Sequence, residues 1–67
     1  MSRRDQEPVF VAEFSDRAGA EEAWSAITAA GIAAAVVTDS PPWGAPLHRV
    51  QVERRDAAAA VRAMKPV

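Results

Sequence analysis

Three short apolar stretches in this chain favour strands, and two longer stretches carry apolar residues at the three- and four-residue spacing of a helix. The β-branched and aromatic residues of the short stretches fit a pleated surface, whereas the longer stretches are rich in alanine. The order predicts strand, helix, strand, strand, helix. We expect strands at 9–14, 32–39 and 47–53, and helices at 17–30 and 56–64.

The first helix has recognisable signals at both ends. Ser15 or Asp16 can cap its free N–H groups, and Gly31 suits the left-handed backbone that ends a helix. Its apolar residues form one stripe, which we expect to pack on the sheet with Trp24 and Ile27 at its centre. The stripe consists of Ala20, Ala23, Trp24, Ile27 and Ala30.

The first strand, VFVAEF, is apolar at both alternating sets of positions. We expect its two phenylalanines, together with Ala12, to face the helices, because they are the largest apolar groups and Glu13 marks the other side as partly hydrated. The side that faces the helices is then Phe10, Ala12 and Phe14. The opposite side is Val9, Val11 and Glu13.

A right-handed crossover through the first helix makes the first two strands parallel, and a hairpin brings the third strand between them. The prediction is an α+β fold with strand order 1-3-2 and both helices on one face. This is a split βαβ unit of ferredoxin-like type without its fourth strand. We expect a disordered leader over residues 1–7 and a single domain over residues 8–65.

The uncovered face of such a sheet is a predicted association surface. It carries a central polar row, in which Arg49 and Gln51 are candidate contacts for a ligand or partner. Apolar residues flank this row, and the unpaired edge of the first strand adds a second surface. The residues expected at an oligomer interface are Val9, Val11, Ala35 and Val37.

The composition excludes several function classes. With 49% hydrophobic residues, 25% charged residues and a net charge of −1, the chain is typical of a globular protein and suggests neither a nucleic-acid nor a membrane partner. It has no cysteine and one histidine, so neither disulfides nor a clustered metal site is expected. No apolar run is long enough for a signal segment or a bilayer span, and we expect a cytoplasmic protein.

Length favours self-association. A chain of 67 residues buries only roughly 60% of the surface that it exposes when unfolded. Small domains gain stability from disulfides, metals or oligomerisation, and the first two are not available here. We therefore expect a homo-oligomer, most simply a dimer, and a protein partner is a further possibility.

The chain resembles a family of small bacterial domains known only as signal-transducing proteins of unknown function. The resemblance spans about 9–64 and is carried by an acidic, alanine-rich helix ending in Gly31-Ile32, and by the motif Val50-Gln51-Val52 before an alanine-rich helix. It implies a ferredoxin-like fold, loosely related to nitrogen-regulatory PII proteins. It implies no settled ligand and supplies no functional residues, and we expect no cofactor. The PPWG of the loop departs from the family pattern.

Two residues outside this pattern are candidate sites. His48 shares its parity with Val50 and Val52, which favours a rim histidine half covered by the second helix over a catalytic base. Trp43 lies in a loop between prolines, where it is either a recognition residue or a lid over the end of the core, with the lid slightly favoured.

We find no arrangement of nucleophile, base and anion cradle, so we expect no catalytic residue and no enzyme. The leading hypothesis is a non-enzymatic regulatory or protein-interaction module that acts as a homo-oligomer through its open sheet face or an edge strand. The alternative is a small-molecule sensor that binds a metabolite or nucleotide near the Trp43 loop, with Arg49 and Gln51 as polar contacts.

Overall fold

A computed structural model of the protein describes residues 6–64. The ends of its elements lie within two residues of the predicted ones. A short 3₁₀ turn, η2 (Arg54–Asp56), precedes the last helix. The other elements are β1 (Pro8–Phe14), α1 (Arg17–Ala29), β2 (Ala34–Asp39), β3 (Leu47–Glu53) and α2 (Ala57–Met64).

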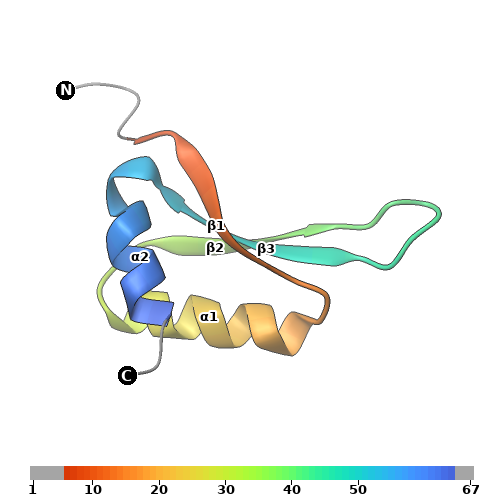
Figure 1. The fold of residues 1–67 in the computed structure, drawn as a ribbon, viewed down its shortest axis with the longest axis horizontal. Helices are drawn as coiled ribbons and strands as arrows, with labels where there is room; N and C mark the ends of the chain where they lie inside the picture. Colours follow the sequence, from red (N-terminus) through yellow and green to blue (C-terminus); the bar gives the residue numbers. More distant parts are fainter. Residues whose placement is uncertain (1–5, 65–67) are drawn as a thin grey trace.

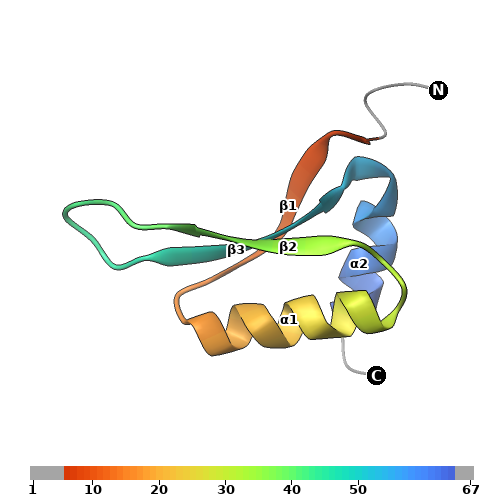
Figure 2. The ribbon, with the colours of Figure 1, turned by 180° about the vertical axis from the view of Figure 1, so that it is seen from behind.

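The strands form one sheet of order β1-β3-β2, in which β3 is antiparallel to both neighbours. The two outer strands are therefore parallel to each other, as the crossover connection requires. Figure 1 shows both helices on the same side of the sheet, and Figure 2 shows α1 running alongside β2. The predicted α+β fold with an open three-stranded sheet and two helices on one face is confirmed.

The ends of α1 follow the predicted chemistry. Asp16 is the cap, and its Oδ1 accepts a hydrogen bond from the Gly19 N–H at 2.7 Å. At the other end Gly31 has a φ of +85°, its N–H bonds to the Thr28 carbonyl, and the Ile32 N–H bonds to the Ile27 carbonyl. These two bonds are those of a Schellman motif, which turns the chain directly into β2.

The predicted facing of β1 is wrong at its N-terminal half. Val9 pairs with Val52 and packs against the core, whereas Phe10 is 52% exposed on the open face. The register shifts between Phe10 and Ala12, where β1 has one more residue than β3. This bulge lets Val9 and Ala12 lie on the same side of the sheet, although they are an odd number of residues apart.

The core is small and lies between the sheet and the two helices. Ile27 and Val50 are its largest fully buried side chains, and alanines supply most of the helix surfaces that close over them. Trp24 does not belong to this buried set, contrary to the prediction. It is 40% exposed at the flank of the sheet, where its indole Nε1–H donates to the Ala34 carbonyl at 2.9 Å. The buried apolar residues are Ala20, Ala23, Ile27, Val50, Val52 and Ala60.

The predicted leader over residues 1–7 and the predicted domain over residues 8–65 stay predictions. Residues 1–5 of the leader, and residue 65 of the domain, lie outside the described residues. Glu7, the last residue of the predicted leader, is attached to the sheet, because its carbonyl accepts from the Arg54 N–H at 2.8 Å. Between residues 6 and 64, the helices are too short or too polar to cross a membrane.

Candidate functional site

The open face of the sheet is defined by the register of the three strands. Phe10 from β1 and Val37 from β2 are its large apolar residues, with exposed fractions of 52% and 38%. Arg49 and Gln51 from β3 lie between the outer strands, opposite Val37 and Ala35 respectively. We call this surface, made of Phe10, Glu13, Ala35, Val37, Arg49 and Gln51, the open face.

The polar groups of the open face largely neutralise one another. Arg49 Nε lies 2.9 Å from Glu13 Oε2, and the guanidinium carbon lies 5.4 Å from the centre of the Phe10 ring. The arginine thus forms an ion pair and a cation–π contact at once. This leaves an apolar surface with a matched pair of charges.

The structure divides the predicted interface residues into two groups. Ala35 and Val37 lie on the open face, as expected from alternation along β2. Val9 and Val11 do not, because both pack against the core cluster on the helix side. Phe10 takes their place on the open face. Because β1 is apolar at both alternating sets of positions, alternation alone does not assign Phe10 to a face, and the large size of its ring was the available sequence signal.

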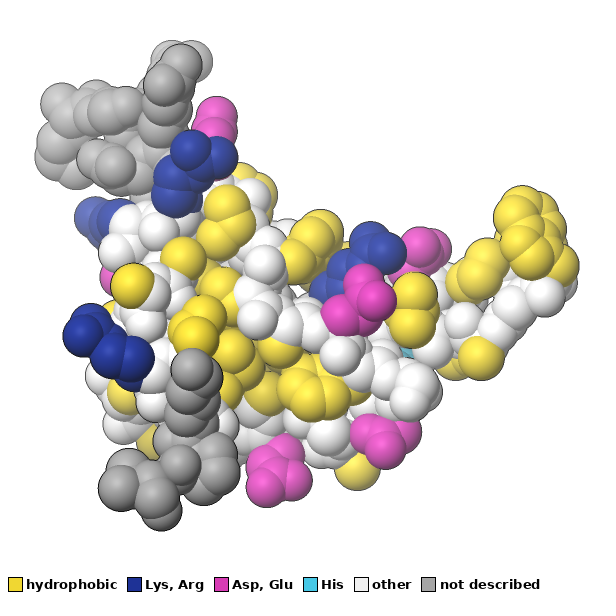
Figure 3. Space-filling model, in the orientation of Figure 1, with side chains coloured by type: hydrophobic (Ala, Val, Ile, Leu, Met, Phe, Trp, Pro, Cys, Tyr) yellow, Lys and Arg dark blue, Asp and Glu magenta, His cyan; other side chains and the backbone are white. Residues whose placement is uncertain are grey.

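Trp43 is exposed at the tip of the β2–β3 hairpin. Its exposed fraction is 87%, so the prediction that it acts as a lid over the core is wrong. Figure 3 shows hydrophobic side chains at this tip, well away from the body of the domain. Trp43 lines neither of the two grooves described below, and nor do Arg49 and Gln51.

His48 has the predicted parity but is more buried than a rim residue, with an exposed fraction of 8%. It lies on the central strand between Phe14 of β1 and Thr38 of β2. Its Nδ1 is 3.0 Å from Thr38 Oγ1, so the ring has a hydrogen-bond partner in the same layer. This arrangement is that of a packed core histidine.

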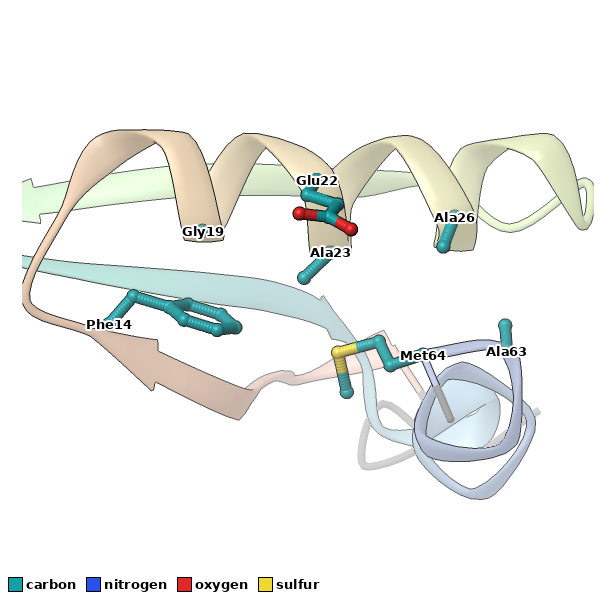
Figure 4. A pocket seen from close by; sticks show the side chains of 7 residues that line it. All are labelled: Phe14, Gly19, Glu22, Ala23, Ala26, Ala63 and Met64. Carbon is teal, nitrogen blue, oxygen red and sulfur yellow. The ribbon is translucent and has the colours of Figure 1, made fainter. Parts of the chain in front are cut away.

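The first groove lies between α1, α2 and the end of β1. Its volume is about 440 Å³, and Figure 4 shows Phe14 and Met64 pointing toward each other across it. We call it the helix groove. Small residues of both helices line it, and Figure 3 shows hydrophobic side chains gathered there. Its lining is Phe14, Gly19, Glu22, Ala23, Ala26, Ala63 and Met64.

The second groove follows the outer edge of β2 beside α1 and has a volume of about 490 Å³. We call it the strand groove. The Trp24 ring lies in its wall, and Arg17 and Glu21 form an ion pair of 3.1 Å at its rim. The lining consists of Arg17, Glu21, Trp24, Ser25, Val36 and Thr38.

Comparison with known proteins adds nothing to the fold. No protein-family model matches the sequence, and neither a curated protein nor a solved structure matches it. The part of the chain from residue 6 to residue 64 contains no group of three His, Asp or Glu side chains placed to hold a metal ion. The site is therefore defined by geometry: a small α+β domain with an open sheet face bounded by two edge strands.

Proposed function

We propose that this protein is a non-enzymatic regulatory or protein-interaction module that acts as a homo-oligomer through the open face of its sheet. The observation that carries the proposal is the exposure of Phe10 and Val37 on a sheet face that no described element covers. The regulatory role rests on the resemblance to signal-transducing domains, and cytoplasmic location belongs to the same proposal.

Burial of this surface is favourable for physical reasons. Apolar area removed from water contributes about 25 cal/mol per Å², and a phenylalanine is among the largest single sources of such area. Because Arg49 is paired with Glu13, covering the face leaves neither of these two charges without a partner. A neutral ion pair at the centre of an apolar patch also favours one relative orientation of two copies.

Phe10→Asp tests the proposal. The new carboxylate lies beside Arg49 and is tolerated in the monomer, but it places a charge where the second copy would pack. We expect the wild-type chain to associate reversibly in sedimentation equilibrium. The variant should require at least about tenfold higher concentration, the cost of about 1.4 kcal/mol of lost contact.

Ala58→Asp is the matched control. Ala58 is exposed in the first turn of α2, where a negative charge is favourable, and it lies on the helix side of the molecule. This variant should associate as the wild type does. A wild-type chain that sediments as a monomer at all concentrations, or equal association of Phe10→Asp and wild type, contradicts the proposal.

A small-molecule sensor is the second candidate, and the strand groove is the observation that favours it. Its volume of about 490 Å³ is within the range of ligand pockets. Its lining contains the aromatic ring of Trp24, the Arg17–Glu21 ion pair, and the hydroxyl groups of Ser25 and Thr38. The proposed ligand position therefore moves from the Trp43 loop to this groove.

Trp43→Phe makes the sensor testable, because Trp24 is then the remaining tryptophan of the chain. Binding of a nucleotide or metabolite in the strand groove should change the Trp24 fluorescence of this variant in a saturable way. Loss of the response in Trp43→Phe/Arg17→Ala would agree with binding at the groove. An unchanged spectrum across a panel of both compound classes would exclude the sensor.

A further inference from the structure

The two edges of the sheet are protected unequally. The free edge of β1 begins with Pro8, which has no N–H, and is interrupted by the bulge between Phe10 and Ala12. Both features discourage pairing with another strand. The free edge of β2 has neither, because residues 34–38 read Ala-Ala-Val-Val-Thr and pair regularly with β3. Of the two edges, β2 is the one open to a further strand.

The hydrogen bonds of the sheet show which backbone groups of β2 are free. Arg54 donates to Glu7, so the next hydrogen-bonded pair along β1 and β3 is Val9 with Val52. The backbone groups of Val52 thus point toward β1. Ala34, its neighbour on β2, must point its own groups to the outer edge.

The hydrogen bond from Trp24 Nε1 to the Ala34 carbonyl shows independently that the backbone groups of Ala34 point to the outer edge of β2. By alternation, the N–H and C=O groups of Val36 and Thr38 also point outward. These four groups face the strand groove, at whose rim Arg17 pairs with Glu21. Asp39, at the end of β2, is the charged residue of the strand itself. Trp24 occupies the remaining outward carbonyl, that of Ala34.

We propose that β2 pairs in antiparallel fashion with β2 of a second copy, with Val37 opposite Val37 of that copy. In this register, Val36 and Thr38 of each copy form hydrogen-bonded pairs with Thr38 and Val36 of the other, so the N–H and C=O groups of both residues are used on both strands. A register centred on Val36 would instead place Thr38 against the carbonyl that Trp24 already occupies.

Edge pairing joins two sheets into one of six strands and leaves the open face uncovered. The two open faces become continuous, with Ala35 and Val37 of both copies at the seam. This inference shares only self-association with the proposed function, because Phe10 lies on β1 at the opposite side of the sheet. The contact involves about six residues a side, which places it below the roughly 1,200 Å² of a standard interface and predicts a weak, reversible dimer.

Disulfide trapping suits a weak contact, and the chain has no cysteine of its own. Val37 and its counterpart form a non-hydrogen-bonded pair with Cα atoms about 4.5 Å apart, which permits a disulfide. Val37→Cys should therefore give a covalent dimer under mild oxidation. Ala35→Cys is the matched control on the same face and strand, because its counterpart is displaced by four residues, about 13 Å. We expect at least about tenfold less dimer from it, since disulfides do not form beyond about 7 Å.

A second variant checks the register by another pair. In Ala35→Cys/Asp39→Cys, residue 35 of one copy lies opposite residue 39 of the other, so cross-linking should return. Equal trapping of Val37→Cys and Ala35→Cys overturns the inference. So does absence of trapping in Val37→Cys when its thiol reacts freely with a soluble reagent.

Repeating the trapping with Phe10→Asp present separates this inference from the proposed function. Trapping of Val37→Cys should persist in that background, because the edge contact does not use Phe10. If trapping persists while Phe10→Asp sediments like the wild type, the edge pairing stands and the face contact falls. If Phe10→Asp weakens association and Val37→Cys is not trapped, the face contact stands and the edge pairing falls.

Discussion

Gly31 determines where α1 ends and in which direction the chain continues. Among the described residues it is the glycine with positive φ, at +85°, and a Cβ built on it would meet no atom within 4 Å. Space is therefore available for a side chain, and only the backbone conformation opposes one. The strain of a left-handed backbone falls on any other residue placed there.

Gly31→Ala should lower the free energy of unfolding by about 1 kcal/mol, because alanine is disfavoured in the left-handed region. The measurement is urea unfolding followed by circular dichroism. Gly44→Ala is the control: its Cβ would lie 3.5 Å from Pro41 Cγ, an ordinary contact, and its φ is not positive. The control should unfold like the wild type, and equal destabilisation of the two variants would contradict the assignment of strain to Gly31.

The facing of a strand or helix was predictable where its pattern of apolar and polar residues assigned one side to the core. In β3, His48, Val50 and Val52 alternate with polar residues, and the structure buries all three. In β1 both sets of positions are apolar, and the bulge after Phe10 changes the facing without leaving a mark in the sequence. Trp24 has helical spacing with Ile27, yet its N–H requires an acceptor, and the free Ala34 carbonyl at the sheet edge provides one.

The β2–β3 hairpin extends beyond the helices, and its loop, residues 40–46, carries Trp43 away from the core (Figure 1). Asp39 and Leu47 form the last pair before the loop. Because the backbone groups of Ala34, Val36 and Thr38 point away from β3, those of Asp39 point toward it, and the Asp39–Leu47 pair is hydrogen-bonded. A pair of this kind closes a two-residue hairpin turn. The hairpin can therefore be shortened without a change of register.

Replacing residues 40–46 with Asn-Gly should preserve the fold and raise the free energy of unfolding by about 1 kcal/mol, through the smaller entropy of loop closure. Urea unfolding measures the change. Trp43→Ser in the intact loop is the control, and it should leave stability unchanged because the side chain is 87% exposed. A marked loss of stability in either variant would mean that the loop packs on the body of the domain.

The whole molecule is flat, with extents of 40 × 31 × 13 Å. The order of strands was predictable because a right-handed crossover and a hairpin allow few arrangements, but the surface that a second copy would cover depends on the bulge and on Trp24.

Association through both surfaces should appear in the thermal stability of the protein. A contact made only by folded chains raises the unfolding temperature as concentration increases. We expect a rise of about 5 °C over an approximately hundredfold increase in wild-type concentration, given the small unfolding entropy of a domain of this size. In Phe10→Asp/Val37→Asp, which removes the face and the edge contact together, the unfolding temperature should be independent of concentration.

The double variant Ala18→Asp/Ala58→Asp adds the same charge at two exposed positions in the first turns of the helices and should behave as the wild type does. A wild-type unfolding temperature that is constant across the range would contradict both contacts, because neither could then stabilise the folded chain.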